Sequence, residues 1–148
     1  MALLLSLLMF GWPVAGPISR RFDPPAQPWL AGHRGVDLSS FPGAPVRAAG
    51  AGRIVFAGLV AGRGVVSIAH ADGLRTTYEP LSLGVVRVGS AVAAGAQIGF
   101  LSPGHPGCPT EACLHWGLRR GAGYLDPLTL LGAGAVRLLP VSRLAGAQ

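Results

Sequence analysis

The sequence predicts an all-β fold, built as a single domain around an antiparallel sheet or sandwich. A length of 148 residues suits one domain. The 23 glycines and 13 prolines are spread along the chain, which favours many short strands joined by turns over long helices. Between these turns, residues alternate between two faces over short runs, as at 65–70, which is the period of a strand.

The first ten residues are almost all apolar, too short a run to span a bilayer, which takes ~20 residues. The run resembles the apolar core of a secretory signal, although no basic residue precedes it and no small-x-small cleavage site comes before Trp12-Pro13. We therefore assign 1–11 to a signal or to an apolar segment that would associate with a membrane. A strand packed into the core is the alternative.

The following elements are read from turn signals and alternation. Residues 12–22 form a first strand that Gly16-Pro17 breaks, and 23–32 form a proline-rich loop. A hairpin is expected around Asp72-Gly73, because this pair tolerates the positive φ of a tight turn. Further strands are expected at 45–48, 54–57, 65–70, 74–78 and 113–119, with a loop at 102–112.

Two later segments need separate mention. The glycine-rich rhythm at 89–99 resembles biotin- and lipoyl-carrier barrels, but these attach their cofactor to lysine, and the chain contains none. A single helical turn is expected at 128–131, with Asp126 as its cap and Pro127 at its first position. The remaining residues, 132–148, are predicted to be a tail, either a flexible end or an edge strand.

The charge pattern narrows the partners. The formal net charge is +6, and every basic side chain is arginine. These arginines are scattered, with pairs only at Arg20-Arg21 and Arg119-Arg120, and no basic run alternates with aromatic residues. Nucleic-acid binding is therefore not expected. A diffuse positive surface suits an anionic polymer or a membrane surface, or serves solubility alone.

Histidine and aspartate are scarce, yet they occur at spacings that suit a metal. His33 and Asp37 are four residues apart, so they share a face in a strand or a helix. Cys113 and His115 are two apart and share one face of a strand. Each pattern alone is common by chance. Together, His33, Asp37 and His115 would hold zinc and leave one position open, as catalytic zinc sites do.

The two cysteines, Cys108 and Cys113, enclose a four-residue loop. If the chain is exported, a disulfide between them is expected, and the apolar start favours this interpretation. If the chain stays in a reducing compartment, Cys113 would be a thiol beside His115 and could even be a fourth zinc ligand.

Six segments occur in a characteristic order: HRGVDL at 33–38, PVRA at 45–48, GRIVFAG at 52–58, TYEPLS at 77–82, the stretch 89–99 and LHW at 114–116. Taken together, they resemble the lysostaphin-like zinc endopeptidases, which cut peptide cross-bridges in bacterial peptidoglycan. The resemblance covers about 12–131, which we take as the domain. It implies a curled antiparallel sheet with a groove, of the duplicated hybrid motif type, and zinc held by His33, Asp37 and His115. It also implies export to the cell envelope or beyond, with peptidoglycan or another anionic wall polymer as partner.

The chain departs from this family at two positions. Pro80 and Cys113 stand where the family usually has the two histidines that handle protons beside the metal. The expected result is a weak zinc endopeptidase, or a non-catalytic wall-binding or regulatory module that retains the metal. Replacement catalytic groups would be His105, which could swing over the groove, or a free Cys113.

The sequence also indicates roles for four other side chains. Glu79 and Glu111 are the remaining titratable candidates, although Glu79, next to Pro80 in a regular strand, would point away from the site. His70 is expected to be a structural residue at a hairpin end, and Trp116 to pack in the core behind the metal.

Overall fold

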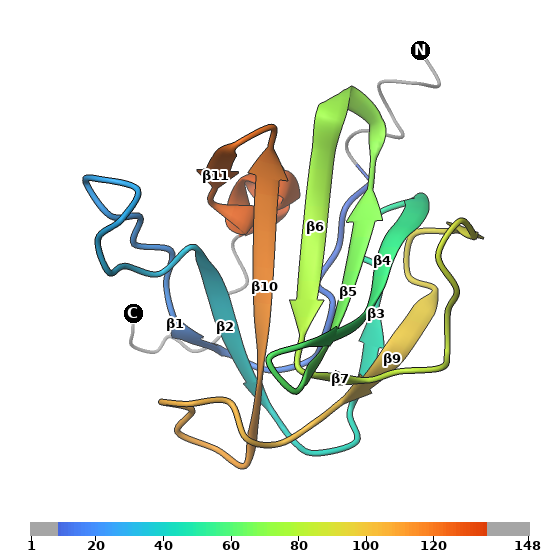
Figure 1. The fold of residues 1–148 in the computed structure, drawn as a ribbon, viewed down its shortest axis with the longest axis horizontal. Coiled ribbons are helices and arrows are strands. Elements are labelled where there is room, and N and C mark those ends of the chain that lie inside the picture. Colours follow the sequence, from blue (N-terminus) through green and yellow to red (C-terminus); the bar gives the residue numbers. More distant parts are fainter. Residues whose placement is uncertain (1–8, 136–148) are drawn as a thin grey trace.

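The computed structural model describes residues 9–135 and confirms the all-β prediction (Figure 1). Short 3-10 segments at η1 (Ala71–Gly73) and η2 (Pro127–Ala135) are the helical elements in this range. The strands are β1 (Ile18–Arg20), β2 (Gly35–Ser40), β3 (Pro45–Arg47), β4 (Gly52–Val60), β5 (Arg63–Ala69), β6 (Leu74–Glu79), β7 (Leu81–Ser82), β8 (Ala91–Val92), β9 (Gln97–Leu101), β10 (Ala112–Arg120) and β11 (Gly123–Leu125).

The strands form two sheets. Within each sheet, neighbouring strands of the described range pair antiparallel. The larger sheet has eight strands in the order β1-β2-β10-β6-β5-β4-β8, with β11 paired to β10. The smaller sheet has the order β3-β9-β7. Figure 1 shows β10 and β6 side by side in the middle of the large sheet, with β7 and β9 at one end of it. Residues 72 or more positions apart in sequence thus meet at β2 and β10.

One hydrophobic core joins the two sheets. The inward face of the large sheet contributes Val36, Leu38, Leu114 and Trp116, all fully buried, and Ile98 comes from the small sheet. Burial of each such side chain contributes about 1.5–3 kcal/mol. Trp116 therefore packs in the core, as the sequence predicted. Because side chains alternate along a strand, the neighbours of these residues face the opposite side of the sheet.

The predicted hairpin is confirmed, with left-handed backbone at Asp72 (φ 69°) and Gly73 (φ 73°) between the paired strands β5 and β6. The helical turn is also present, and the Leu128 N–H donates to the Asp126 carboxylate at 3.0 Å. The turn is of 3-10 type, and further 3-10 structure follows to Ala135 after a non-helical residue at Gly132 (φ 53°).

The first predicted strand is shorter than expected. It occupies Ile18–Arg20 and not 12–22. The reason lies at Gly16, where φ is 146° and a Cβ atom would overlap the carbonyl oxygen of Ser39. Close backbone approach at this glycine places the chain before Pro17 outside the ladder.

His70 is structural, as predicted. Its Nδ1 donates to the Ala51 carbonyl at 2.7 Å, and its Nε2 lies 2.6 Å from the Thr76 hydroxyl, which in turn contacts the Tyr78 hydroxyl at 2.7 Å. Burial lowers the pKa of His70 and raises the pKa of Tyr78 to about 12.

Most of the predicted N-terminal segment 1–11, and all but the start of the tail 132–148, lie outside the described residues. Between residues 9 and 135, the chain contains no helix with the length and apolar character that crossing a membrane requires.

Candidate metal centre

A single row of cross-strand partners carries the site. Asp37 on β2 lies opposite His115 on β10, and His115 lies opposite Glu79 on β6. These three residues point to the face of the sheet opposite the buried Trp116, since successive residues of a strand alternate. The row therefore places a carboxylate and an imidazole from distant parts of the chain next to each other.

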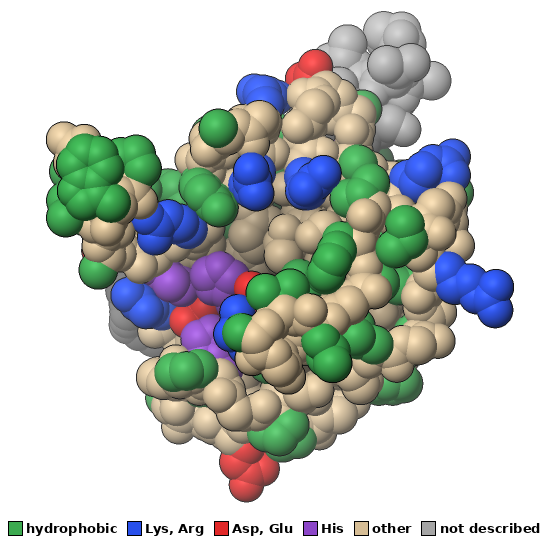
Figure 2. All heavy atoms as spheres, in the orientation of Figure 1, with side chains coloured by type: hydrophobic (Ala, Val, Ile, Leu, Met, Phe, Trp, Pro, Cys, Tyr) green, Lys and Arg blue, Asp and Glu red, His purple; other side chains and the backbone are tan. Residues whose placement is uncertain are grey.

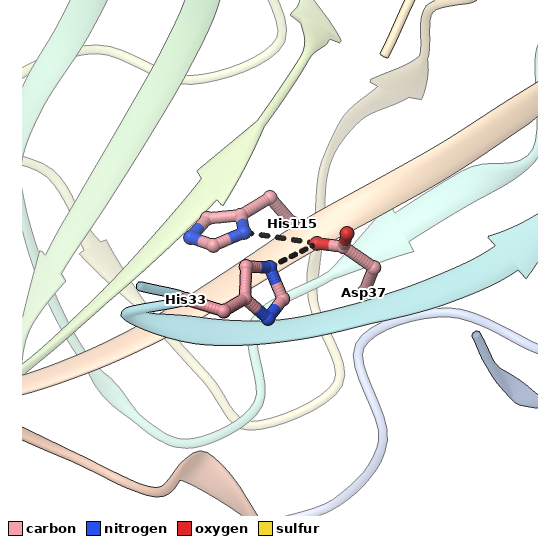
Figure 3. Close-up of side chains that lie close together, drawn as sticks. All are labelled: His33, Asp37 and His115. Carbon is pink, nitrogen blue, oxygen red and sulfur yellow. Dashed lines mark hydrogen bonds and ion pairs between the residues drawn. The ribbon is translucent and has the colours of Figure 1, made fainter. Parts of the chain in front are cut away.

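Side chains of His33, Asp37 and His115 converge on one point (Figure 3). Asp37 Oδ1 lies 3.0 Å from His33 Nε2 and 2.9 Å from His115 Nδ1. One potential ligand atom from each of the three residues lies within 4.8 Å of the others. His33 and Asp37 are buried, whereas the side chain of His115 is 22 % exposed. The group is thus closed on the protein side and open on the side of His115.

The loop before β2 fixes the orientation of His33. Backbone hydrogen bonds join His33 to Asp23 in both directions, at 2.7 and 2.8 Å. The His33 Nδ1 lies 2.8 Å from the carbonyl oxygen of Arg21. A carbonyl oxygen can only accept, so Nδ1 carries the proton and Nε2 is directed into the site. Metal-binding imidazoles are commonly oriented in this way, by a hydrogen bond from the ring nitrogen that does not bind the metal.

Gly35 leaves the space that the His115 ring occupies. A Cβ atom at this position would lie 2.8 Å from His115 Nε2 and 2.5 Å from the carbonyl oxygen of Trp116. The glycine between the two sequence candidates therefore allows the close approach of β2 and β10 that brings their side chains together.

The electrostatics of Asp37 favour its charged form. Burial by itself raises the pKa of this carboxyl group, but the hydrogen bond with His115 and the charges of the neighbouring histidines outweigh it, and the pKa lies below its usual value. Asp37 is consequently an anionic oxygen ligand at neutral pH.

The donor set fits zinc. Two imidazole nitrogens and one carboxylate oxygen are a common set for catalytic zinc, with a further position left open. A neutral His33 with its proton on Nδ1 presents the Nε2 lone pair to the Asp37 oxygen, a repulsive contact at 3.0 Å unless a cation or a second proton lies between them. The tautomer that Arg21 imposes is therefore the one that a metal at this point would require.

A third histidine reaches the same carboxylate from the loop before β10. His105 Nε2 lies 3.3 Å from Asp37 Oδ1, and the side chain is 14 % exposed. Its Nδ1 lies 2.8 Å from the carbonyl oxygen of Pro106, so Nε2 again faces the site. His105 does not belong to the group whose potential ligand atoms all lie within 4.8 Å of one another. It stands beside this group, on its open side.

The expectation for Glu79 was wrong. Glu79 does not point away: it lies opposite His115 and lines a cavity with it, and its carboxylate accepts from Arg63 Nε at 2.8 Å. The expectation assumed that strand alternation continues through Pro80, but β6 ends at Glu79. No pattern in the sequence indicates that Arg63 pairs with Glu79.

Cys113 occupies the same face as His115 but offers no thiol. Its sulfur is bonded to that of Cys108, and Cys113 is fully buried near the hydroxyl groups of Ser19 and Ser39. In this structure the residue can neither take a proton nor bind a metal. The bond also ties the loop that carries His105 to β10.

Two hollows meet at His115, on the open side of the candidate metal centre. One, of about 560 Å³, extends along the outer face of β10, β6 and β5, and a second, of about 500 Å³, lies between Arg63, Pro80 and the loop of His105. His115 and Glu79 line both. Figure 2 shows histidine side chains gathered in a hollow of this face, with basic side chains around it. An extended chain could thus pass the open side of the candidate metal site.

Comparisons with known proteins show the family to which this chain belongs. Residues 31–127 match the model of Peptidase family M23, so the chain belongs to that family, the lysostaphin-like zinc metallopeptidases. The matched range includes His33, Asp37, His105 and His115.

Individual proteins agree with this assignment. The chain is 54% identical over 138 residues to Rv2891 of Mycobacterium tuberculosis, covering 89% of this chain and 55% of the relative. It is 34% identical over 118 residues to the DD-carboxypeptidase/endopeptidase Mpg of Neisseria meningitidis, covering 79% of this chain and 26% of that protein. It thus spans about half the length of the mycobacterial relative.

A solved structure shares the fold. The catalytic domain of lysostaphin from Staphylococcus simulans superposes with a TM-score of 0.66 at 29% identity, over 78% of this chain and 92% of that chain. The curled all-β architecture expected from the resemblance is therefore confirmed.

Proposed function

We propose that this protein is a zinc-dependent endopeptidase that cleaves peptide cross-links of peptidoglycan. The observation that carries the proposal is the convergence of His33, Asp37 and His115 on one point with an open side. Membership of the M23 family and similarity to a protein named as a carboxypeptidase and endopeptidase support it.

Zinc would be held by His33, Asp37 and His115, and would supply the Lewis acidity that polarises a peptide carbonyl. The protein's own groups would orient the ligands and the substrate. The Arg21 carbonyl fixes the His33 tautomer, and the groove would place the substrate bond beside His115. The low pKa of Asp37 keeps its carboxylate charged as a ligand.

His105 is the group that we propose to replace the two missing histidines. Its Nε2 lies on the open side of the site, while its Nδ1 proton is held by the Pro106 carbonyl. In this position the ring can accept a proton from the attacking water and return it to the leaving amine. A general base or acid contributes typically 10²- to 10⁴-fold to the rate. Glu79 is the weaker choice, because Arg63 neutralises its charge.

The absence of the two usual family histidines, at Pro80 and Cys113, favours a second function. Pro80 and Cys113 have no proton to exchange, and a chain that keeps only the metal ligands could bind the wall without cutting it. In this case zinc would be structural, and the protein would be a wall-binding or regulatory module.

An exported location accompanies either function. The substrate lies outside the cytoplasm, and a disulfide such as Cys108–Cys113 persists in oxidising compartments. The apolar start of the chain would supply the signal or a membrane attachment. Peptidoglycan, an anionic polymer, suits the arginine-rich surface.

A digest distinguishes the two functions. The purified protein, loaded with zinc, is incubated with cross-linked peptidoglycan, and released muropeptides are separated by liquid chromatography and mass spectrometry. The endopeptidase predicts a fall in cross-linked dimers that a chelator abolishes and added zinc restores. Sedimentation of the protein with peptidoglycan, with no cleavage product at any zinc concentration, would favour the wall-binding module.

A further inference from the structure

The longer hollow combines a smooth floor with a basic end. Beyond the row of Asp37, His115 and Glu79, the next row on the same face consists of Gly35, Gly117, Thr77 and Ser67. Gly117, Thr77 and Ser67 line the hollow and keep this part of its floor low, which suits an extended peptide, whereas the ring of His115 fills the space beside Gly35. Two residues further along these strands, Arg119 on β10 lies opposite Arg75 on β6.

Three arginines line this end of the hollow, namely Arg34, Arg75 and Arg119. The guanidinium groups of Arg34 and Arg119 lie over the ring of Tyr124, 5.9 and 5.3 Å from its centroid. Contacts of this kind hold a cation in place without neutralising it. The ring of Tyr124 thus fixes two positive charges at the same end of the groove.

Within residues 9–135, none of the three arginines has a carboxylate partner. The one acid that lines this hollow, Glu79, is paired with Arg63. Like charges directly opposite each other on neighbouring strands are destabilising, as Arg75 and Arg119 are here. The Nε of Arg119 is moreover buried with no hydrogen-bond partner among the described residues. Both features would be relieved by an anion bound between the arginines.

The distance from the candidate metal centre indicates where such an anion would come from. Arg119 follows His115 by four residues on the same strand, a separation of about 14 Å between their Cα atoms. An extended peptide covers that distance in roughly four residues. A group bound at the arginines would therefore be part of the same peptide as the bond at His115.

We infer that the arginine end of the groove is a specificity subsite for a carboxylate of the substrate peptide, three to four residues from the cleaved bond. The inference rests on the proposed function and adds to it the substrate class: stem peptides whose side carboxylates are free. Arg75 and Arg119 would bind the carboxylate, and Arg34 with Tyr124 would complete the positive wall. Substrates in which these carboxylates are amidated would bind more weakly.

A matched pair of ligands tests this inference. One is a cross-linked muropeptide dimer with free stem carboxylates, and the other is the same dimer with those carboxylates amidated. Dissociation constants for both are measured by calorimetry with the zinc-loaded protein, and cleavage of both is followed in parallel. Arg75→Gln and Arg119→Gln remove one charge each. Arg87→Gln, at an exposed arginine outside the groove, is the matched control.

The free-acid dimer is expected to bind the native protein roughly tenfold more tightly than the amidated dimer, as charge-assisted hydrogen bonds predict. Each groove variant should reduce this preference to about twofold or less, and Arg87→Gln should leave it unchanged. Arg75 is exposed, so its substitution tests the subsite even if Arg119→Gln lowers stability.

Two results would overturn the inference, and they are distinguishable. Equal affinity for the two dimers, with both cleaved, would remove the carboxylate subsite and leave the endopeptidase intact. Absence of binding and cleavage with either dimer would remove the proposed function together with the subsite.

Discussion

The two sides of the candidate metal centre are built in different ways. The ligand side consists of adjacent strands: β2 and β10 hold Asp37 and His115 in register, and a backbone carbonyl fixes His33. The opposite side consists of a loop, in which His105 reaches Asp37 from a segment tied to β10 by the Cys108–Cys113 bond. In the proposed mechanism, metal binding would thus depend on sheet register, whereas proton transfer would depend on the position of one loop.

This difference separates two measurable properties. Changes on the strand side should remove the metal and, with it, every activity that depends on the metal. Changes on the loop side should reduce turnover and leave the metal in place.

The largest effect is expected for Asp37→Ala. Removal of the anionic ligand should abolish zinc binding and bring cleavage of peptidoglycan below detection, because two imidazoles alone hold zinc weakly. Zinc content is measured after dialysis by mass spectrometry. Asp72→Ala is the control, since that exposed carboxylate pairs with Arg120 away from the site and should keep the native zinc content. Equal zinc in both variants would disprove the ligand assignment.

His105→Ala should lower the rate of cleavage by about 10²- to 10⁴-fold, the usual contribution of a positioned acid or base. Zinc content should be unchanged, because His105 is not one of the three ligands. Glu111→Gln, on the exposed part of the same loop, should retain the native rate. Loss of zinc in His105→Ala would show instead that this residue binds the metal.

Gly35→Ala should weaken zinc binding about 10- to 100-fold, as changes that reorient a ligand commonly do. The added methyl group would meet the ring of His115 and the backbone of Trp116. Gly117→Ala is a matched control on the neighbouring strand, where the nearest heavy atom to the new Cβ lies 3.8 Å away. Competition with a fluorescent chelator measures both affinities, and equal values would contradict this role of Gly35.

The smallest effect is expected for the disulfide. The Cys108→Ser/Cys113→Ser double variant should lower the free energy of unfolding by about 2 kcal/mol. It should also reduce turnover several-fold through a less fixed His105, with zinc content unchanged. Denaturant unfolding and the cleavage assay measure the two effects. A reducing agent should reproduce them in the native protein and have no effect on the double variant. A native turnover rate in the double variant would mean that the loop holds His105 without the bond.

The sequence named the three candidate ligands and also His105 as a candidate replacement catalytic group, but it did not define where the loop of His105 lies. His33, Asp37 and His115 could be named because they are scarce, share faces at short spacings and match the family motif. The position of His105 depends on how the loop 102–111 folds back, and no local pattern encodes this. Glu79 was misassigned because alternation predicts direction only within a strand, and β6 ends there. The first strand was drawn too long because the close approach of Gly16 to Ser39 is a tertiary contact.

The zinc content of the native protein decides whether His33, Asp37 and His115 form a metal site. The chain is purified without added metal chelators, its zinc is quantified, and the ligand set is examined by X-ray absorption at the zinc edge. We expect about one zinc per chain, bound by two imidazole nitrogens and by oxygen, and lost in Asp37→Ala. A protein that binds no zinc even when zinc is supplied, or that binds it equally well without Asp37, would contradict this expectation.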